Sequence, residues 1–274
     1  MLPARFRTWI KEGPIMSTIT TTYPLRGYEP QVPSTTPAIA VRVWGFWATL
    51  GWFAVAVGAA AASEFLTGFF FAVWWAIAYP NVPIDFESAV FAHLSTAISV
   101  PTVALVLVLA ARRRGSLGNY LGLVWPHWRH ILLGLGMLVA IGFAGAGIDH
   151  LFPSFNQMAD AISEYRAAMT SPVALALFWF TLVVTAPVAE EIIFRGFLMR
   201  SWSESRIGVA GAILLSSVIF TMIHIQYNVV TLATVLMLGL AFGVMRWRSG
   251  STLLTMMMHA AWNLGCGITI VLSA

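Results

Sequence analysis

Two acids and one base lie inside a stretch of the sequence that is otherwise almost entirely apolar. The stretch runs from residue 171 to residue 199 and contains Glu190, Glu191 and Arg195. A charged side chain near the centre of a bilayer is costly, so three together indicate a buried pairing and a function. Glu191 and Arg195 are four residues apart, which places them on one helical face with the acid N-terminal to the base. Glu190 points about 100° away and stays free for other chemistry.

Pro187 stands one turn before these charges. Proline has no N–H and cannot donate to the carbonyl of Val183, which weakens the helix at this point. Buried charges beside a loosened backbone are typical of a wet cavity. We therefore expect the acidic helix to be distorted next to a water-accessible site.

Two later apolar stretches carry further polar side chains. Phe220 and His224 are four residues apart, as are His259 and Asn263, so each pair shares one helical face. Because a bilayer rejects polar side chains, we expect them to turn inward and meet the acids. Carboxylates, imidazoles and an amide can together activate a water molecule and stabilise an oxyanion. The candidate site therefore consists of Glu190, Glu191, Arg195, His224, His259 and Asn263.

Other interpretations of these residues remain open. A single His or Asn in a membrane span often only ties helices together. Glu190, His224 and His259 could also hold a catalytic zinc ion, since two imidazoles and a carboxylate form a familiar zinc set. The His-Glu-x-x-His helix of common metalloproteases is, however, absent from the sequence.

The composition predicts an integral membrane protein. Of the 274 residues, 59% are hydrophobic and only 9% are charged, whereas a soluble domain carries about 25% charged residues. The net charge of +4 does not indicate nucleic-acid binding, because most basic residues lie at the ends of apolar stretches. A single cysteine, Cys266, excludes an internal disulfide and a cysteine-based metal cluster.

The apolar stretches predict an all-α, polytopic transmembrane helical bundle with about seven spans. As a helix, the stretch 43–79 is about 55 Å long, too long for one straight crossing and short for two. We predict one crossing with a membrane-embedded extension; splitting this stretch would give an eighth span. The predicted spans are 43–79, 88–111, 131–148, 171–199, 207–225, 229–245 and 251–272.

Basic residues predict the orientation of these spans. If the arginines at 112–114 are cytoplasmic, the acidic loop 80–87 is outside and every clearly basic loop falls on one side. The N-terminus is then inside, in a multi-pass protein of the cytoplasmic membrane. Three regions are predicted along the chain: a flexible tail at 1–40, N-terminal transmembrane helices at 41–117 and a catalytic transmembrane core at 118–274.

The motifs together resemble those of a known family. They are Glu190-Glu191-x-x-x-Arg195, then Phe220-x-x-x-His224, then His259-x-x-x-Asn263, in this order on successive hydrophobic segments. The pattern is similar to that of the CAAX protease and bacteriocin-processing (CPBP/ABI) family, intramembrane endopeptidases related to the Ras-converting CAAX prenyl endopeptidase. The resemblance covers roughly residues 118 to 270 and includes the Gly122-Leu123 turn.

The resemblance implies a role for each motif residue. It implies that Glu190 and His224 activate water and that His259 and Asn263 hold the oxyanion. The second glutamate and the arginine of the first motif are implied to support the site. The resemblance also favours a glutamate enzyme without a cofactor over a zinc enzyme.

The predicted function is therefore hydrolysis of a peptide bond within the membrane boundary. The predicted partners are the lipid bilayer and a membrane-associated or lipidated peptide, including prenylated CAAX-type sequences, and not nucleic acid. One alternative is a non-catalytic membrane scaffold or immunity protein of the same fold. A transporter is another, which the distortion at Pro187 suits but which the lack of two similar halves disfavours.

Overall fold

A computed structural model of the chain describes residues 42–155, 157–169 and 171–274. Residues 41–274 form one compact unit. The predicted tail at 1–40 lies outside the described residues. The predicted division of the compact unit at residue 117 stays a prediction.

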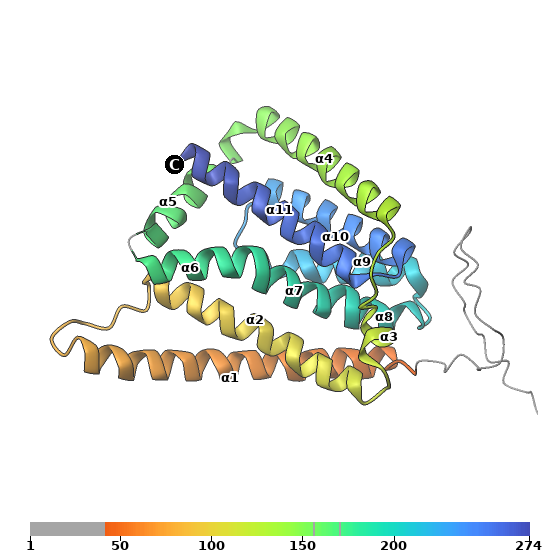
Figure 1. Cartoon of the computed structure of the whole chain (residues 1–274), viewed down its shortest axis with the longest axis horizontal. Helices are drawn as coiled ribbons and strands as arrows, with labels where there is room; N and C mark the ends of the chain where they lie inside the picture. The colour runs from red at the N-terminus through yellow and green to blue at the C-terminus, as the bar shows by residue number, and fades with distance from the viewer. Residues whose placement is uncertain (1–41, 156, 170) are drawn as a thin grey trace, which may run out of the picture. The chain divides into compact units, whose positions relative to one another are not determined.

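Every regular element in the described part of the chain is a helix, as the predicted all-α class requires (Figure 1). The long helices are α1 (Phe46–Ala78), α2 (Ala89–Arg112), α4 (Trp128–Leu151), α10 (Val229–Ser249) and α11 (Thr252–Ser273). The short ones are α3 (Leu117–Leu121), η1 (Pro153–Phe155), α5 (Met158–Met169) and α9 (Gly208–Met222). The acidic helix is continuous over 172–203 and consists of α6 (Pro172–Phe180), η2 (Thr181–Thr185), α7 (Ala186–Glu191), η3 (Ile192–Leu198) and α8 (Met199–Ser203).

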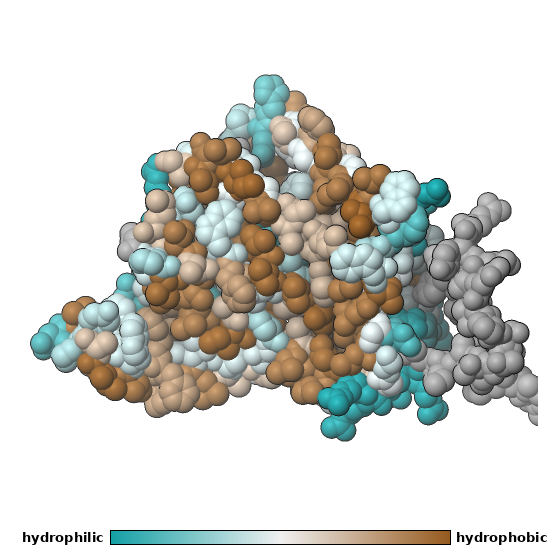
Figure 2. Space-filling view, in the orientation of Figure 1, coloured by the Kyte–Doolittle hydropathy of each residue, from teal (hydrophilic) through white to brown (hydrophobic). Residues whose placement is uncertain are grey.

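Six helices among the described residues are long and apolar enough to cross a membrane. They are α1, α2, α4, the helix 172–203, α10 and α11. Large apolar side chains face outward, with Phe65 and Phe143 exposed by 75% and 77%. Figure 2 shows hydrophobic residues over most of the visible face and hydrophilic ones gathered near the ends of helices. The protein is therefore an integral membrane protein; α9, with 15 residues, is a shorter apolar helix, and a seventh span stays a prediction.

The first helix, α1, is uninterrupted over its 33 residues. At 1.5 Å per residue it is about 50 Å long, well above the ~30 Å of a hydrocarbon core. This agrees with one crossing that continues into an extension. The helix has no break at which the alternative eighth span could form.

The helices α1 and α2 pack lengthwise against each other (Figure 1). The ring centroid of Phe71 on α1 lies 5.0 Å from that of Phe91 on α2, and 6.1 Å from that of Phe86 in the loop between the two helices. On its other side α2 packs against α6 and α7. The N-terminal pair is thereby joined to the acidic helix.

The acidic helix contains two π-helical segments, η2 and η3, directly before and after α7. In η2 the N–H of Ala186 donates to the carbonyl of Thr181, five residues back. After η3 the N–H of Met199 donates to the carbonyl of Phe194, again five back. π-Helical turns are rare and occur frequently at functional sites. The predicted distortion before the acids is present, and η2 ends two residues before Pro187.

The turn after α3 is tied to the junction of α10 and α11. Gly122 has a φ of 68°, and a Cβ there would lie 2.3 Å from Nη2 of Arg246, so glycine is required. The Gly122 carbonyl accepts a hydrogen bond from the N–H of Thr252 at 2.8 Å. The hydroxyl of Ser251 donates to the carbonyl of Val124 at 2.6 Å. These bonds fix the start of α11, which carries two of the predicted site residues.

Candidate active site

Glu191 and Arg195 form the predicted ion pair, and both side chains are fully buried. Arg195 Nη1 donates to Glu191 Oε1 at 2.9 Å. Arg195 Nη2 donates to the carbonyl of Gly239 on α10, also at 2.9 Å. The ion pair lies within the acidic helix, and the second bond of Arg195 ties this helix to α10. Loss of one partner of the pair would leave an uncompensated buried charge.

Phenylalanine rings surround the guanidinium of Arg195. Its Cζ atom lies 4.6 Å from the ring centroid of Phe220 on α9 and 5.2 Å from that of Phe242 on α10. Ring faces attract a cation, and the attraction is stronger where water is excluded. Arg195 is thus committed to groups within the protein, as expected of a residue that supports a site.

His259 of α11 lies between the two glutamates. Its Nδ1 atom is 3.2 Å from Glu191 Oε1, and its Nε2 atom is 4.0 Å from Glu190 Oε2. A carboxylate oxygen only accepts hydrogen bonds, so Nδ1 carries the hydrogen and Nε2 is the atom that faces Glu190. Glu190 Oε2 is buried and has no hydrogen-bond partner in the described part of the chain. Glu190 is therefore the uncommitted acid, as the helical spacing predicts.

His224 lies in a turn and not inside a helix, which corrects the prediction that the helix runs to residue 225. The helix α9 ends at Met222, because the amides of His224 and Tyr227 bond to carbonyls only three residues back, each at 3.0 Å. The Nδ1 atom of His224 is 2.8 Å from the carbonyl oxygen of Phe220. Since a carbonyl only accepts, Nδ1 carries the hydrogen and Nε2 of the neutral ring is an acceptor.

The ring of Phe220 connects the two imidazoles. Its centroid lies 5.0 Å from that of His224 and 5.8 Å from that of His259. No hydrogen bond joins His224 directly to Glu190 within the described ranges. Residues 223–228 connect α9 to α10 without helical structure.

Asn263 lies one turn beyond His259 on α11 and is half-buried. Its Nδ2 atom donates to the carbonyl of Leu182 in η2 at 2.8 Å. This bond joins α11 to the acidic helix eight residues before Glu190. One hydrogen of the amide is thus used within the protein, and the second remains for another acceptor.

The structure brings four of the six predicted residues into one contact network: Glu190, Glu191, Arg195 and His259. His224 joins the network through the ring of Phe220, and Asn263 contacts the same helix further along. No three His, Cys, Asp or Glu side chains gather closely enough to hold a metal ion among the residues that the structure describes. The alternative zinc set is therefore not assembled in this arrangement, and zinc dependence stays a prediction.

Some contributors to this network escaped the sequence analysis. One is the carbonyl of Gly239, since a backbone group leaves no trace in a side-chain pattern. Another is Phe242, whose ring centroid lies 5.4 Å from that of His259. A third is Tyr227, which stacks on His224 with 6.0 Å between centroids. Phenylalanine is common in apolar spans and gives no signal there, whereas Tyr227, three residues after His224, could have been found.

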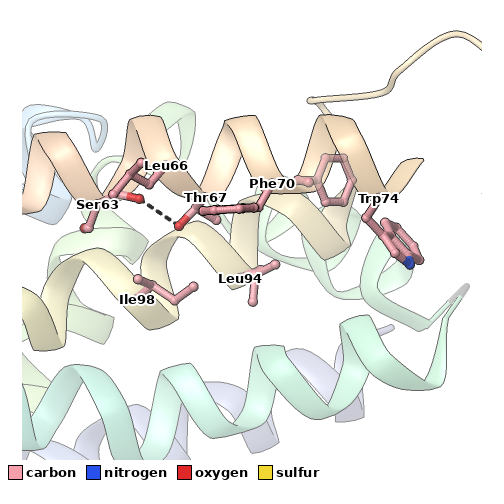
Figure 3. Close-up of a pocket in the computed structure, with 8 residues that line it drawn as sticks. Ser63, Leu66, Thr67, Phe70, Trp74, Leu94 and Ile98 are labelled. Atoms are coloured by element: carbon pink, nitrogen blue, oxygen red, sulfur yellow. Dashed lines mark hydrogen bonds between the residues drawn. The ribbon is translucent and has the colours of Figure 1, made fainter. Parts of the chain in front are cut away.

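A hollow lies between α1 and α2 (Figure 3), and none of the six predicted site residues lines it. Its volume is about 420 Å³. The hydroxyl groups at its wall are already engaged, Ser63 with the carbonyl of Ala60 and Thr67 with that of Ser63, both at 2.8 Å. The hollow therefore offers apolar surface. Its lining consists of Ser63, Leu66, Thr67, Phe70, Phe71, Trp74, Leu94 and Ile98.

Comparison with known proteins finds a family to which part of the chain is similar. Residues 172–265 match the family model described as type II CAAX prenyl endopeptidase Rce1-like. This segment contains all six predicted site residues, so the resemblance is confirmed over 94 of the 274 residues. A protein of Escherichia coli described as "Uncharacterized 24.3 kDa protein" is 37% identical over 82 residues. The alignment covers 29% of this chain and 37% of that relative's length, and no solved structure matches.

Proposed function

We propose that this membrane protein is an intramembrane endopeptidase in which Glu190 activates water to hydrolyse a peptide bond. The observation that carries the proposal is the contrast between two neighbouring acids. Glu191 is engaged through Oε1 by both Arg195 and His259, and only its Oε2 lacks a hydrogen-bond partner in the described residues. For Glu190 the buried oxygen without such a partner, Oε2, is the one that faces His259. The match of residues 172–265 to the Rce1-like endopeptidases supports this reaction class.

In the proposed reaction Glu190 accepts a proton from water as the water oxygen bonds to the substrate's carbonyl carbon. His224, whose Nδ1–H donates to the Phe220 carbonyl, accepts a hydrogen bond at Nε2 from the second O–H of the water, and that hydrogen stays on the oxygen. His259, through the Nε2 edge of its ring, and Asn263, through its second N–H, donate to the oxyanion; one such donor commonly contributes about 10²–10³ in kcat. The C–N bond then breaks, and Glu190 returns the proton to the leaving amine. No covalent enzyme intermediate forms.

The proposed substrate is a membrane-associated peptide, with a prenylated CAAX-type C-terminus as the first candidate. We place the basic loops on the cytoplasmic side of the cytoplasmic membrane. The C-terminal ends of α2, α8 and α10 lie at one end of the bundle, and arginines occur there at 112–114, 200–206 and 246–248 (Figure 1). This arrangement supports an N-terminus on the inside.

The test uses purified protein in lipid bicelles with a prenylated C-terminal peptide and its unmodified counterpart. We expect the wild-type protein to release product, detected by mass spectrometry, and Glu190→Gln to reduce the rate by about 10²–10⁴-fold with an unchanged melting temperature. Glu64→Gln is the matched control, because Glu64 is an exposed acid on α1 outside the network. Retained turnover in Glu190→Gln would remove Glu190 as the base.

The same assay separates the alternatives. A metal-free mechanism predicts the full rate after chelator treatment of protein whose metal content has been measured. Loss of the rate on chelation and its return with zinc would establish the zinc enzyme. A wild-type protein that binds the peptides and never cuts them would support the scaffold or immunity protein.

A further inference from the structure

The carbonyl of Leu182 lacks both the α-helical and the π-helical donor that its own helix would normally supply. In η2 the N–H of Ala186 donates to Thr181, five residues back, and not to Leu182, four residues back. The next amide along the chain belongs to Pro187, which has no N–H. The Leu182 carbonyl therefore accepts no hydrogen bond from either the α-helical or the π-helical donor position. An open carbonyl in a membrane segment costs free energy unless another group donates to it.

The side chain of Asn263 supplies the missing donor from a different helix. Its Nδ2 atom lies 2.8 Å from the Leu182 oxygen. The two helices approach closely here, since a Cβ on Gly267 would lie 2.7 Å from the ring of Trp179 and 3.1 Å from the Leu182 side chain. A small residue one turn beyond Asn263 thus lets the short amide reach the helix backbone.

We propose that Asn263 is a positioning residue that caps the carbonyl which Pro187 leaves open on Leu182. The cap holds the wide turn of η2, and this turn sets how α7 presents Glu190 to His259. The contacts Leu182–Asn263 and Glu190–His259 tie the same two helices at two levels. With one N–H fixed, the second has a set direction, which the oxyanion uses; this last role rests on the proposed function.

The test is a double-mutant cycle with Pro187→Ala, which restores an N–H that can donate to Leu182 or Val183. In the wild-type background we expect Asn263→Ala to lower the melting temperature in lipid bicelles by about 2–4 °C. In the Pro187→Ala background we expect the same substitution to lower it by less than half as much. Asn263→Asp, which keeps the shape and loses the donor when ionised, should behave like Asn263→Ala.

Thr269→Ala is the matched control on α11. Its hydroxyl bonds to the carbonyl of Gly265 within the same helix, so its effect should be equal in both backgrounds. An equal drop for Asn263→Ala in both backgrounds, or no drop in either, would overturn the cap. This measurement needs no substrate and is independent of the proposed function.

Cleavage kinetics then separate the two roles of the amide. If both roles hold, the double variant regains stability while its kcat stays about 10²–10³-fold low with an unchanged KM. If the double variant regains kcat as well, Asn263 acts as a cap alone. That second outcome supports the cap and removes Asn263 as the oxyanion donor of the proposed reaction.

Discussion

Two regions of the bundle are held together by different kinds of contact. Around α7, directional bonds between buried groups connect Glu191, Arg195 and His259 across three helices. Between α1 and α2, packed rings such as those of Phe71 and Phe91 make the contact, and the acid on α1, Glu64, points outward. Lipid chains are as apolar as these rings, so lipid can replace the second kind of contact but not the first.

The difference teaches where geometry is fixed in this protein. A buried polar network tolerates few arrangements, because each donor or acceptor must keep its partner. An apolar interface keeps most of its contact energy when the side chains repack. Substitutions near α7 should therefore have large, specific effects, and substitutions between α1 and α2 should have small, graded ones.

The largest effect is expected at the buried ion pair. Arg195→Met removes the arginine partner of the fully buried Glu191 and leaves it only His259, which should lower the free energy of unfolding by about 3–5 kcal/mol. SDS-induced unfolding in lipid bicelles measures this loss. The double variant Glu191→Leu/Arg195→Met removes both charges and should be more stable than Arg195→Met alone. A single variant with nearly wild-type stability would contradict the contrast between the regions.

A smaller effect is expected where backbone bonds hold the start of α11. Gly122→Ala forces an alanine to a φ of 68° and places its Cβ 2.3 Å from Arg246 Nη2 and 2.8 Å from the Gly250 carbonyl. We expect a loss of about 2–3 kcal/mol in the same unfolding assay. Gly136→Ala on α4 is the control, since a Cβ there meets nothing within 4 Å. Equal stability of the two variants would show that the α3 turn does not hold α11.

Most of the fold could be predicted from the hydropathy of the sequence. The predicted span 131–148 is found as α4, residues 128–151, and the predicted span 229–245 as α10, residues 229–249. The end of α9 could not be predicted, because apolar residues continue past it to Ile225 while the backbone tightens into turns. Hydropathy reports which residues prefer lipid, and it does not report where a helix stops within it.

The site could be predicted in part. The pairing of Glu191 with Arg195 follows from four-residue spacing and is confirmed. The loss of a donor to the Val183 carbonyl at Pro187 follows from the sequence, whereas the π turn that takes the Ala186 N–H from Leu182 to Thr181 could not be predicted, because periodicity does not reveal an inserted residue. The contact between Glu190 and His259 joins residues 69 positions apart, and only the packing of α11 against α7 creates it.

The smallest effect on peptide cleavage is expected from a substitution between α1 and α2. The same substitution, Phe to Leu, can be made in both regions, so their effects can be compared directly. Phe71→Leu and Phe242→Leu each replace a phenyl ring that is at least 96% buried with a smaller side chain. We expect each substitution to lower the free energy of unfolding by about 1 kcal/mol. Only Phe242 lies against His259 and the Arg195 guanidinium, so only Phe242→Leu should slow peptide cleavage. The Phe71→Leu variant should cleave the peptide at the wild-type rate, because the aromatic rings around Phe71 make no hydrogen bond or ion pair with α7. Equal losses of cleavage in the two variants would mean that the aromatic pair also sets the geometry of the site.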